Sequence, residues 1–230
     1  MERSIPRKVR DVIPEEQVYH DLKRYQEAAL EMKGVTGAVI IGRDDIYVDR
    51  RDSYKCYIPK CWGYGMSASC PPHTLKPDET LQLVQCYRHA IFIKNDLPAD
   101  VVAGPEVGKA VKTGEIDPEK KSVEIARATI GIVKAVTQLE SMAFYDGYHL
   151  AIGFGAGTCK VTLCYKFPNC AVLSGEKCRN TYLSRPSMEA VGFDVFRMAA
   201  RVGWDIYPVG AHCNPDNITQ GNIMGIVLVT

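Results

Sequence analysis

The chain has 230 residues, of which 46% are hydrophobic and 24% are charged, as is ordinary for a globular protein with one sizeable core. Its 28 Lys and Arg residues against 27 Asp and Glu residues give a net charge of +1, so no electrostatic footprint points to nucleic acid. The N-terminus lacks the apolar core of a secretory signal, and the most apolar long stretch, residues 122–144, is interrupted by charged residues. We therefore expect a cytoplasmic protein without a membrane span.

Apolar residues at three- and four-residue steps predict helices, and short apolar or alternating runs between turn residues predict strands. In chain order, we expect a helix over 14–33, strands over 37–42 and 45–51, a helix over 76–89, a strand over 90–96, a helix over 120–145, a strand over 149–159, a helix over 187–203 and strands over 205–210 and 223–230. This alternation favours one layered α/β or α+β domain over residues 1–230, with a mixed sheet and helices. Residues 97–118 lack periodicity and are expected to form a long loop or insertion.

Seven of the nine cysteines fall into two groups within irregular segments, which we expect to be loops on one side of the sheet. The first group is Cys56, Cys61 and Cys70, and the second group is Cys159, Cys164, Cys170 and Cys178. In a reducing cytoplasm, clustered cysteines indicate metal ligands or catalytic thiols rather than disulfides. Cys86 and Cys213 stand alone, and Cys86 is interpreted as a small buried hydrophobe.

The spacing of the second group favours an iron–sulfur cluster over zinc. Structural zinc is usually held by cysteines two to four residues apart, whereas the gaps here are four, five and seven residues. A cluster is larger than an ion, accepts ligands from a wider loop and requires thiolates in groups of four. Glycines at 153, 155 and 157, ahead of Cys159, are expected to let backbone N–H groups approach the cluster sulfurs.

The first group supplies only three thiolates, which leaves three alternatives open. Cys213 or His73 completes the site, a cysteine of the second group crosses over, or one iron keeps a position open for a small molecule. Trp62 and Tyr64 either shield this centre from water or serve in ordinary packing.

Two ordered motifs resemble a prokaryotic family of predicted metal-binding proteins, a domain of unknown function. One motif is "CYIPKCWGYGMSASCPP", and the other is the second cysteine group followed by "RPSMEAVGFDVF". The similarity runs from about Tyr54 to the end of the chain, apart from residues 97–118. By this resemblance all seven grouped cysteines match cysteines of the family. The resemblance implies an iron–sulfur protein of anaerobic metabolism and does not supply a reaction.

We therefore expect an iron–sulfur domain in which the seven grouped cysteines bind two [4Fe–4S] clusters. The expected function is electron transfer, either as a separate module or as a redox subunit of an anaerobic enzyme system. One alternative is an enzyme whose three-cysteine cluster activates a small substrate at its open iron. A second alternative is a zinc-stabilised binding module. The expected partner is a redox protein or a larger redox complex, and a homo-oligomer is compatible with the sequence.

Overall fold

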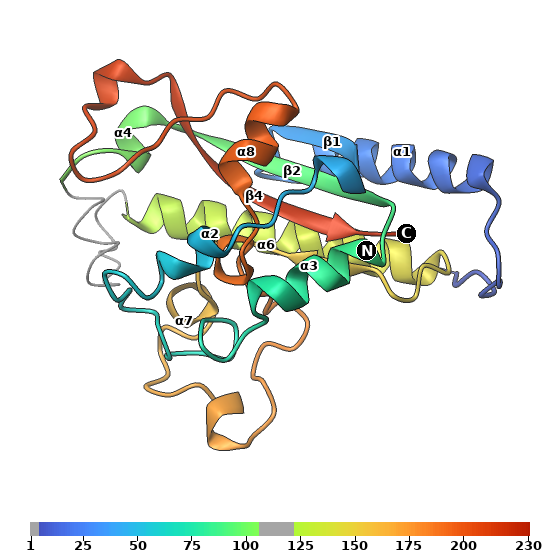
Figure 1. Cartoon of the computed structure of the whole chain (residues 1–230), viewed down its shortest axis with the longest axis horizontal. Coiled ribbons are helices and arrows are strands. Elements are labelled where there is room, and N and C mark those ends of the chain that lie inside the picture. The colour runs from blue at the N-terminus through green and yellow to red at the C-terminus, as the bar shows by residue number, and fades with distance from the viewer. Residues whose placement is uncertain (1–4, 106–121) are drawn as a thin grey trace.

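The computed structural model describes residues 5–105 and 122–230, and its centre is a four-stranded sheet in the order β1-β2-β4-β3 (Figure 1). The strands are β1 (Gly37–Gly42), β2 (His89–Pro98), β3 (Ile152–Phe154) and β4 (Gln220–Leu228). The layered α/β class is confirmed, although each strand pairing in this sheet is antiparallel rather than mixed. The end of β1 at Gly42 pairs with the start of β2 at His89, because the intervening chain returns to the end of the sheet that it left.

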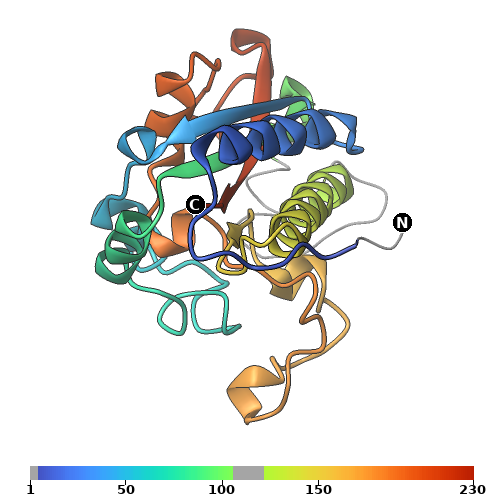
Figure 2. The ribbon, with the colours of Figure 1, turned by 90° about the vertical axis from the view of Figure 1, so that its right-hand side faces the viewer.

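Helices α1 (Glu15–Glu31) and α6 (Ser122–Tyr145) cover one face of this sheet (Figure 2). In α1, Val18, Leu22, Tyr25 and Ala29 follow the three- and four-residue step of a helix, and all four side chains are buried. They form a core with α6 and with alternate residues of β2 and β4. No helix within the described residues has the length and apolar character needed to cross a membrane.

The opposite face is covered by α3 (Pro77–Gln85), α8 (Val195–Arg201) and the residues just before α8. Phe92 and Ile226 point from the central strands into this second core, where Phe154 packs edge-on against Phe193 with ring centroids 5.1 Å apart. Each such buried side chain contributes roughly 1.5–3 kcal/mol to folding. The domain therefore has three layers, with a helical layer on each face of the sheet.

Two expected strands are absent from the described residues. Residues 45–51 instead form the end of the 3-10 helix η1 (Arg43–Asp45), a single bridge from Val48 to Phe193, and the start of α2 (Arg50–Tyr54), which Asp49 caps. Residues 205–210 do not pair with any strand of the described residues. An alternating apolar pattern therefore did not suffice in either segment, because strand formation also depends on pairing and packing with the rest of the fold.

The other boundaries differ in smaller ways. The expected loop at 97–118 begins with the end of β2 and the short helix α4 (Ala99–Val102), and residues 106–118 lie outside the described residues. The expected helix over 187–203 is divided into the 3-10 helix η3 (Glu189–Val191) and α8, because Gly192 adopts a φ of +96° between them.

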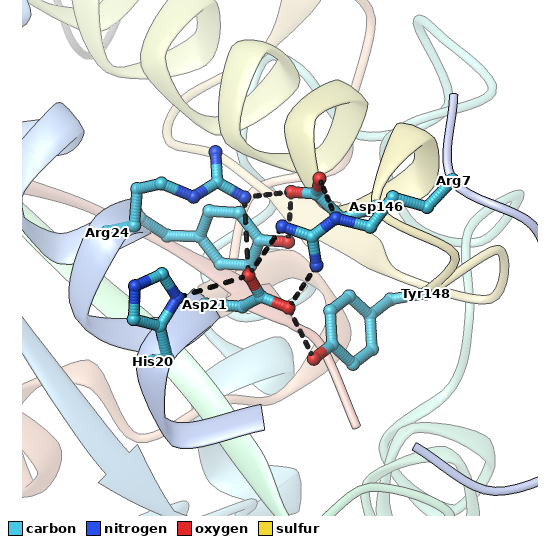
Figure 3. Close-up of polar contacts among 7 residues, drawn as sticks. Arg7, His20, Asp21, Arg24, Asp146 and Tyr148 are labelled. Carbon is cyan, nitrogen blue, oxygen red and sulfur yellow. Dashed lines mark hydrogen bonds and ion pairs between the residues drawn. The ribbon is translucent and has the colours of Figure 1, made fainter. Parts of the chain in front are cut away.

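A buried ion network joins the N-terminal segment to α1 and to the end of α6 (Figure 3). The Asp21 carboxylate is fully buried and accepts hydrogen bonds from Arg7 at 2.6 and 2.9 Å and from the Tyr148 hydroxyl at 3.0 Å. Beside it, Asp146 accepts from the Tyr25 hydroxyl at 2.7 Å. The buried charge is thereby paired and hydrogen-bonded, as its burial requires.

Candidate metal centre

The two cysteine segments are residues 50–73 and 159–185. They project from neighbouring points of the domain and lie side by side below the sheet and α6 (Figures 1 and 2). At the base of the first segment, the Asp49 N–H donates to the Gly192 carbonyl at 2.8 Å. At the base of the second, the Gly155 N–H donates to the Pro186 carbonyl at 2.9 Å. Residues 185–194 therefore contact the bases of both cysteine segments. The order of the motifs along the chain did not reveal this contact.

The structure brings the three cysteines of the first group together. Burial, together with repulsion from the charges of the adjacent Cys61 and Cys70 thiols, raises the pKa of the Cys56 thiol to about 11. Cys70 is the most buried of the three, with 7% of its surface exposed. A cation bound among these thiols would reverse the effect by stabilising the thiolates.

Two features beside the first group fit a bound metal cluster. A methyl group added at Gly63 would lie 3.8 Å from Cys61 Sγ and 3.9 Å from Cys70 Sγ, so glycine keeps the space between these sulfurs open. The Ser67 hydroxyl is buried and has no hydrogen-bond partner within the described residues. Burial raises the pKa of the Cys70 thiol, and the nearby Ser67 hydroxyl offsets part of this rise. A thiolate or a cluster sulfur would satisfy this hydroxyl.

The second group surrounds a single cavity of about 260 Å³. The side chains of all four cysteines line it, namely Cys159, Cys164, Cys170 and Cys178. Ala68 and Ser69 of the first cysteine segment and Arg179 are among the other residues of its wall. Because the gaps between these cysteines in the sequence total sixteen residues, their convergence on one cavity is a property of the fold.

Polar groups are directed at the sulfurs of the second group. Asn180 donates its backbone N–H to Cys178 Sγ at 3.4 Å and its side-chain amide to Cys164 Sγ at 3.1 Å. Burial alone would raise the pKa of Cys170, but backbone N–H groups, that of Ala68 first among them, outweigh burial and lower this pKa. Donors of this kind stabilise the negative charge of metal-bound sulfur.

The glycines before Cys159 have a different structural role from the one we expected. A methyl group added at Gly153 would lie 2.4 Å from a Val136 side-chain carbon, and one at Gly155 would lie 2.9 Å from a Val133 side-chain carbon. Their N–H groups donate to Glu140 and to Pro186, and not to sulfur. These glycines therefore allow β3 to approach α6 closely, while other residues supply the donors to sulfur.

Of the remaining candidates, Cys86 and Cys213 belong to neither group, whereas His73 is next to the first group and donates its backbone N–H to the Cys70 carbonyl at 2.9 Å. Cys86 is exposed rather than buried, because α3 ends at Gln85 and the Cys86 thiol turns back to the Gln82 carbonyl at 3.6 Å. Residues 205–219, which include Cys213, lie at the opposite end of the molecule from the cysteine segments in both views (Figures 1 and 2). His73 is exposed.

The two arginines that flank the second group differ in their surroundings. Arg185 forms a two-pronged ion pair with Glu140 of α6, at 2.6 and 2.9 Å, and so anchors the end of the cysteine segment to the domain. Arg179 lines the cavity, and its positive charge contributes to lowering the pKa of Cys170. Arg179 is therefore the cation placed to offset negative charge at this site.

Several polar residues of the site were not identified from the sequence. Ser69 and Thr158 each precede a grouped cysteine, and Ser67 and Asn180 lie within three residues of one. Their adjacency to cysteine was the available signal, but which sulfur each one faces depends on how the two segments meet.

Within the described residues, no group of three or more Cys, His, Asp or Glu side chains is positioned to hold one metal ion. The four cysteines of the second group instead line a cavity of about 260 Å³.

The α/β domain gathers seven thiols into two adjacent loops, and thiols are the donors that soft metals prefer. A family model described as "Predicted metal-binding protein (DUF2284)" matches residues 39–229, and the chain belongs to this family. The resemblance seen in the cysteine motifs is thereby confirmed. No curated protein and no solved structure matches the chain significantly.

Proposed function

We propose that the protein binds two [4Fe–4S] clusters, one in each cysteine group, and transfers electrons. The observation that carries this proposal is the convergence of the four thiols of the second group on one cavity, with N–H donors from Asn180 directed at two of them. Thiolates in a set of four with such donors are the ligands of this cofactor. When bound, a [4Fe–4S] cluster accepts and releases one electron, and the surrounding protein sets its potential.

The setting of the two cysteine segments supports a protein partner. Residues 50–73 and 159–185 contain nine Lys and Arg residues and two Asp and Glu residues, whereas the rest of the chain contains nineteen and twenty-five. The cysteine-bearing end is thus positive and the remainder negative. Part of the positive charge offsets the clusters, and exposed lysines are free to attract an acidic redox protein or redox complex.

The proposed setting is the cytoplasm of an anaerobic cell. All nine cysteines lie within the described residues, and each is a free thiol. A reducing compartment keeps thiols in this state, and clusters bound in loops near the surface require protection from oxygen.

A second candidate function is an enzyme that uses an open iron in the first group. This group contains three cysteines, and residues 205–219 with Cys213 lie at the other end of the molecule. A cluster held by three thiolates leaves one iron able to bind a small substrate and act as a Lewis acid. Cyanide added to the reduced protein would perturb the EPR signal of such a cluster and would leave a fully ligated cluster unchanged.

Metal analysis after anaerobic purification or reconstitution tests the main proposal. We expect iron and sulfide in equal amounts, and about half of both lost when any cysteine of the second group is replaced by serine. Cys86→Ser and Cys213→Ser are the matched controls and should retain all of the iron. A colourless protein with zinc, or unchanged iron in the second-group variants, would contradict the proposal.

A further inference from the structure

The two cysteine groups contact each other through a reciprocal pair of hydroxyl groups. The Cys70 thiol donates to Thr158 Oγ1 at 3.2 Å, and Thr158 immediately precedes Cys159. The Cys159 thiol in turn lies 3.9 Å from Ser69 Oγ, and Ser69 immediately precedes Cys70. Each group therefore places a hydroxyl against a sulfur of the other group.

Both hydroxyls are held in position by further contacts. Thr158 caps the short helix α7 (Cys159–Thr162), where its side chain accepts the Lys160 N–H at 3.2 Å. Ser69 Oγ lies 3.3 Å from Ser184 Oγ, close to the end of the second cysteine segment. The contacts between the groups thus belong to the packed base of both segments.

The first segment also forms part of the second site. Ala68 and Ser69, which lie just before Cys70, line the cavity of the second group together with Cys159. The wall of one proposed site is therefore built in part by the segment that carries the other.

We infer that the two cysteine groups form one unit of two coupled centres, between which an electron passes at the contacts made by Ser69 and Thr158. This inference rests on the proposed function. The reduced centre loses one electron and is oxidised, the other centre gains that electron and is reduced, and no atom is transferred. Electron tunnelling falls steeply with distance, so a direct contact between ligand residues favours rapid exchange.

Each of these two hydroxyls also tunes the reduction potential of the centre in the other cysteine group. A hydroxyl is both donor and acceptor, so it can donate to a metal-bound thiolate. Such a donor stabilises the more negative, reduced form of a cluster and raises its potential. Thr158 lies in the second segment but faces Cys70 of the first centre, whereas Ser69 lies in the first segment but faces Cys159 of the second.

EPR of the fully reduced wild-type protein provides the first test. With both clusters loaded, we expect split and rapidly relaxing signals from two interacting spins. Two loaded, reduced clusters whose signals are those of isolated centres would overturn the inference and leave the proposed function standing. A protein that loads zinc or a single cluster would overturn both.

Potentiometric titration of single variants provides the second test. Thr158→Val should lower the potential of the first centre, and Ser69→Ala should lower that of the second, while the iron content is kept. Thr158→Ser retains the hydroxyl and should restore the wild-type potential. Thr162→Val and Ser174→Ala are matched controls, since their hydroxyls bond to the Thr158 and Cys170 carbonyls. The inference would be overturned if variants with both clusters loaded showed no shift in potential, or if each variant shifted the potential of the centre in its own segment instead.

Discussion

At the scale of single residues, Gly63 marks the space that the first centre would fill. A methyl group there would meet Cys61 Sγ, Cys70 Sγ and a Thr158 carbon at 3.8–3.9 Å, which are ordinary contact distances. We expect Gly63→Ala to unfold at nearly the same temperature as the wild type, because the empty site tolerates the methyl group. The same methyl group would occupy the space between two cluster ligands, so about half of the iron should be lost.

The measurements are iron content after anaerobic reconstitution and thermal unfolding of the protein without metal. Gly210→Ala is the control, since a methyl group at Gly210 meets no atom within 4 Å. Full iron content in Gly63→Ala would show that the first centre does not lie between these sulfurs.

Asp21 is a second residue with a specific expected effect, in this case on stability. Burial by itself would raise its pKa, but hydrogen bonds from Arg7 and Tyr148 outweigh burial and hold the pKa below its usual range (Figure 3). The carboxylate therefore stabilises the fold fully above the unfolded-state pKa, and this contribution is lost as the pH falls below about 4.

Asp21→Asn should lower the free energy of unfolding by roughly 2–3 kcal/mol at neutral pH, because it removes the buried carboxylate that pairs with Arg7 at 2.6 Å and leaves only Asp146, at 3.3 Å, as the acidic partner of Arg7. This figure is below that of a fully buried pair, since the Arg7 side chain is 39% exposed and water screens it. The variant should also lose stability less steeply in acid. Asp45→Asn, which removes an exposed partner of Arg201, should cost less than about 1 kcal/mol. Equal losses in urea denaturation of the two variants would contradict this prediction.

At the scale of elements, residues 185–194 determine whether the two cysteine segments can meet. Arg185 fixes one end to α6, Ser187 accepts the Ala190 N–H at 3.2 Å, and the Gly192 carbonyl accepts the Asp49 N–H. The "RPSMEAVG" motif therefore has a physical role as the connection between the two cysteine segments.

Gly192→Ala should destabilise the protein by roughly 2–3 kcal/mol. A left-handed backbone costs a non-glycine residue about 1–2 kcal/mol, and the added methyl group would also meet Pro77 Cβ at 2.8 Å. Gly203→Ala has a similar positive φ of +76° with no atom within 4 Å, so it should incur the backbone cost alone. In chemical denaturation, Gly192→Ala should have a lower free energy of unfolding than Gly203→Ala. Only Gly192→Ala should also bind less iron. Equal behaviour of the two variants would contradict this role.

The helices and strands also show which elements the sequence alone could predict. The helix expected over 14–33 was found at 15–31, because its period of buried residues is a local signal. Residues 45–51 and 205–210 have strand-like patterns, but strand formation depends on a partner that the local sequence does not contain. Cys86 follows the buried Val84 by two residues, so it lies on a different side of the helix end and is exposed, whereas Tyr87 is the next buried residue.

The candidate site shows the same division between local and long-range information. The division of the seven cysteines into three and four follows from their spacing, and the structure places each set together. The contacts of Ser69 with Cys159 and of Thr158 with Cys70 join residues about ninety positions apart. Only the folded arrangement of both segments reveals such pairs.

At the scale of the whole molecule, charge is divided between two ends. The cysteine segments have a net charge of +7 and the rest of the chain one of −6, although the total is only +1. Lysines in the second cysteine segment, such as Lys166 and Lys177, are exposed. When an acidic protein approaches, the electrostatic field would orient its acidic surface toward the positive, cysteine-bearing end of this molecule.

Electron transfer to a purified acidic ferredoxin should therefore be fast at low ionic strength and slow as salt is added. Replacing Lys166 and Lys177 by Glu reverses charge beside the second centre, and we expect the rate constant to fall by about ten-fold or more at low salt. At high salt the variant and the wild type should converge, because charges further apart than roughly 8–10 Å are then screened. Stopped-flow absorbance of the reduced protein mixed with the oxidised ferredoxin measures this rate. Lys23→Glu in α1 with Lys33→Glu just after it makes the same change in net charge away from the cysteine segments (Figure 1) and should leave the rate nearly unchanged. If both double variants slow the reaction equally, net charge alone steers the encounter and the cysteine-bearing end is not the docking face.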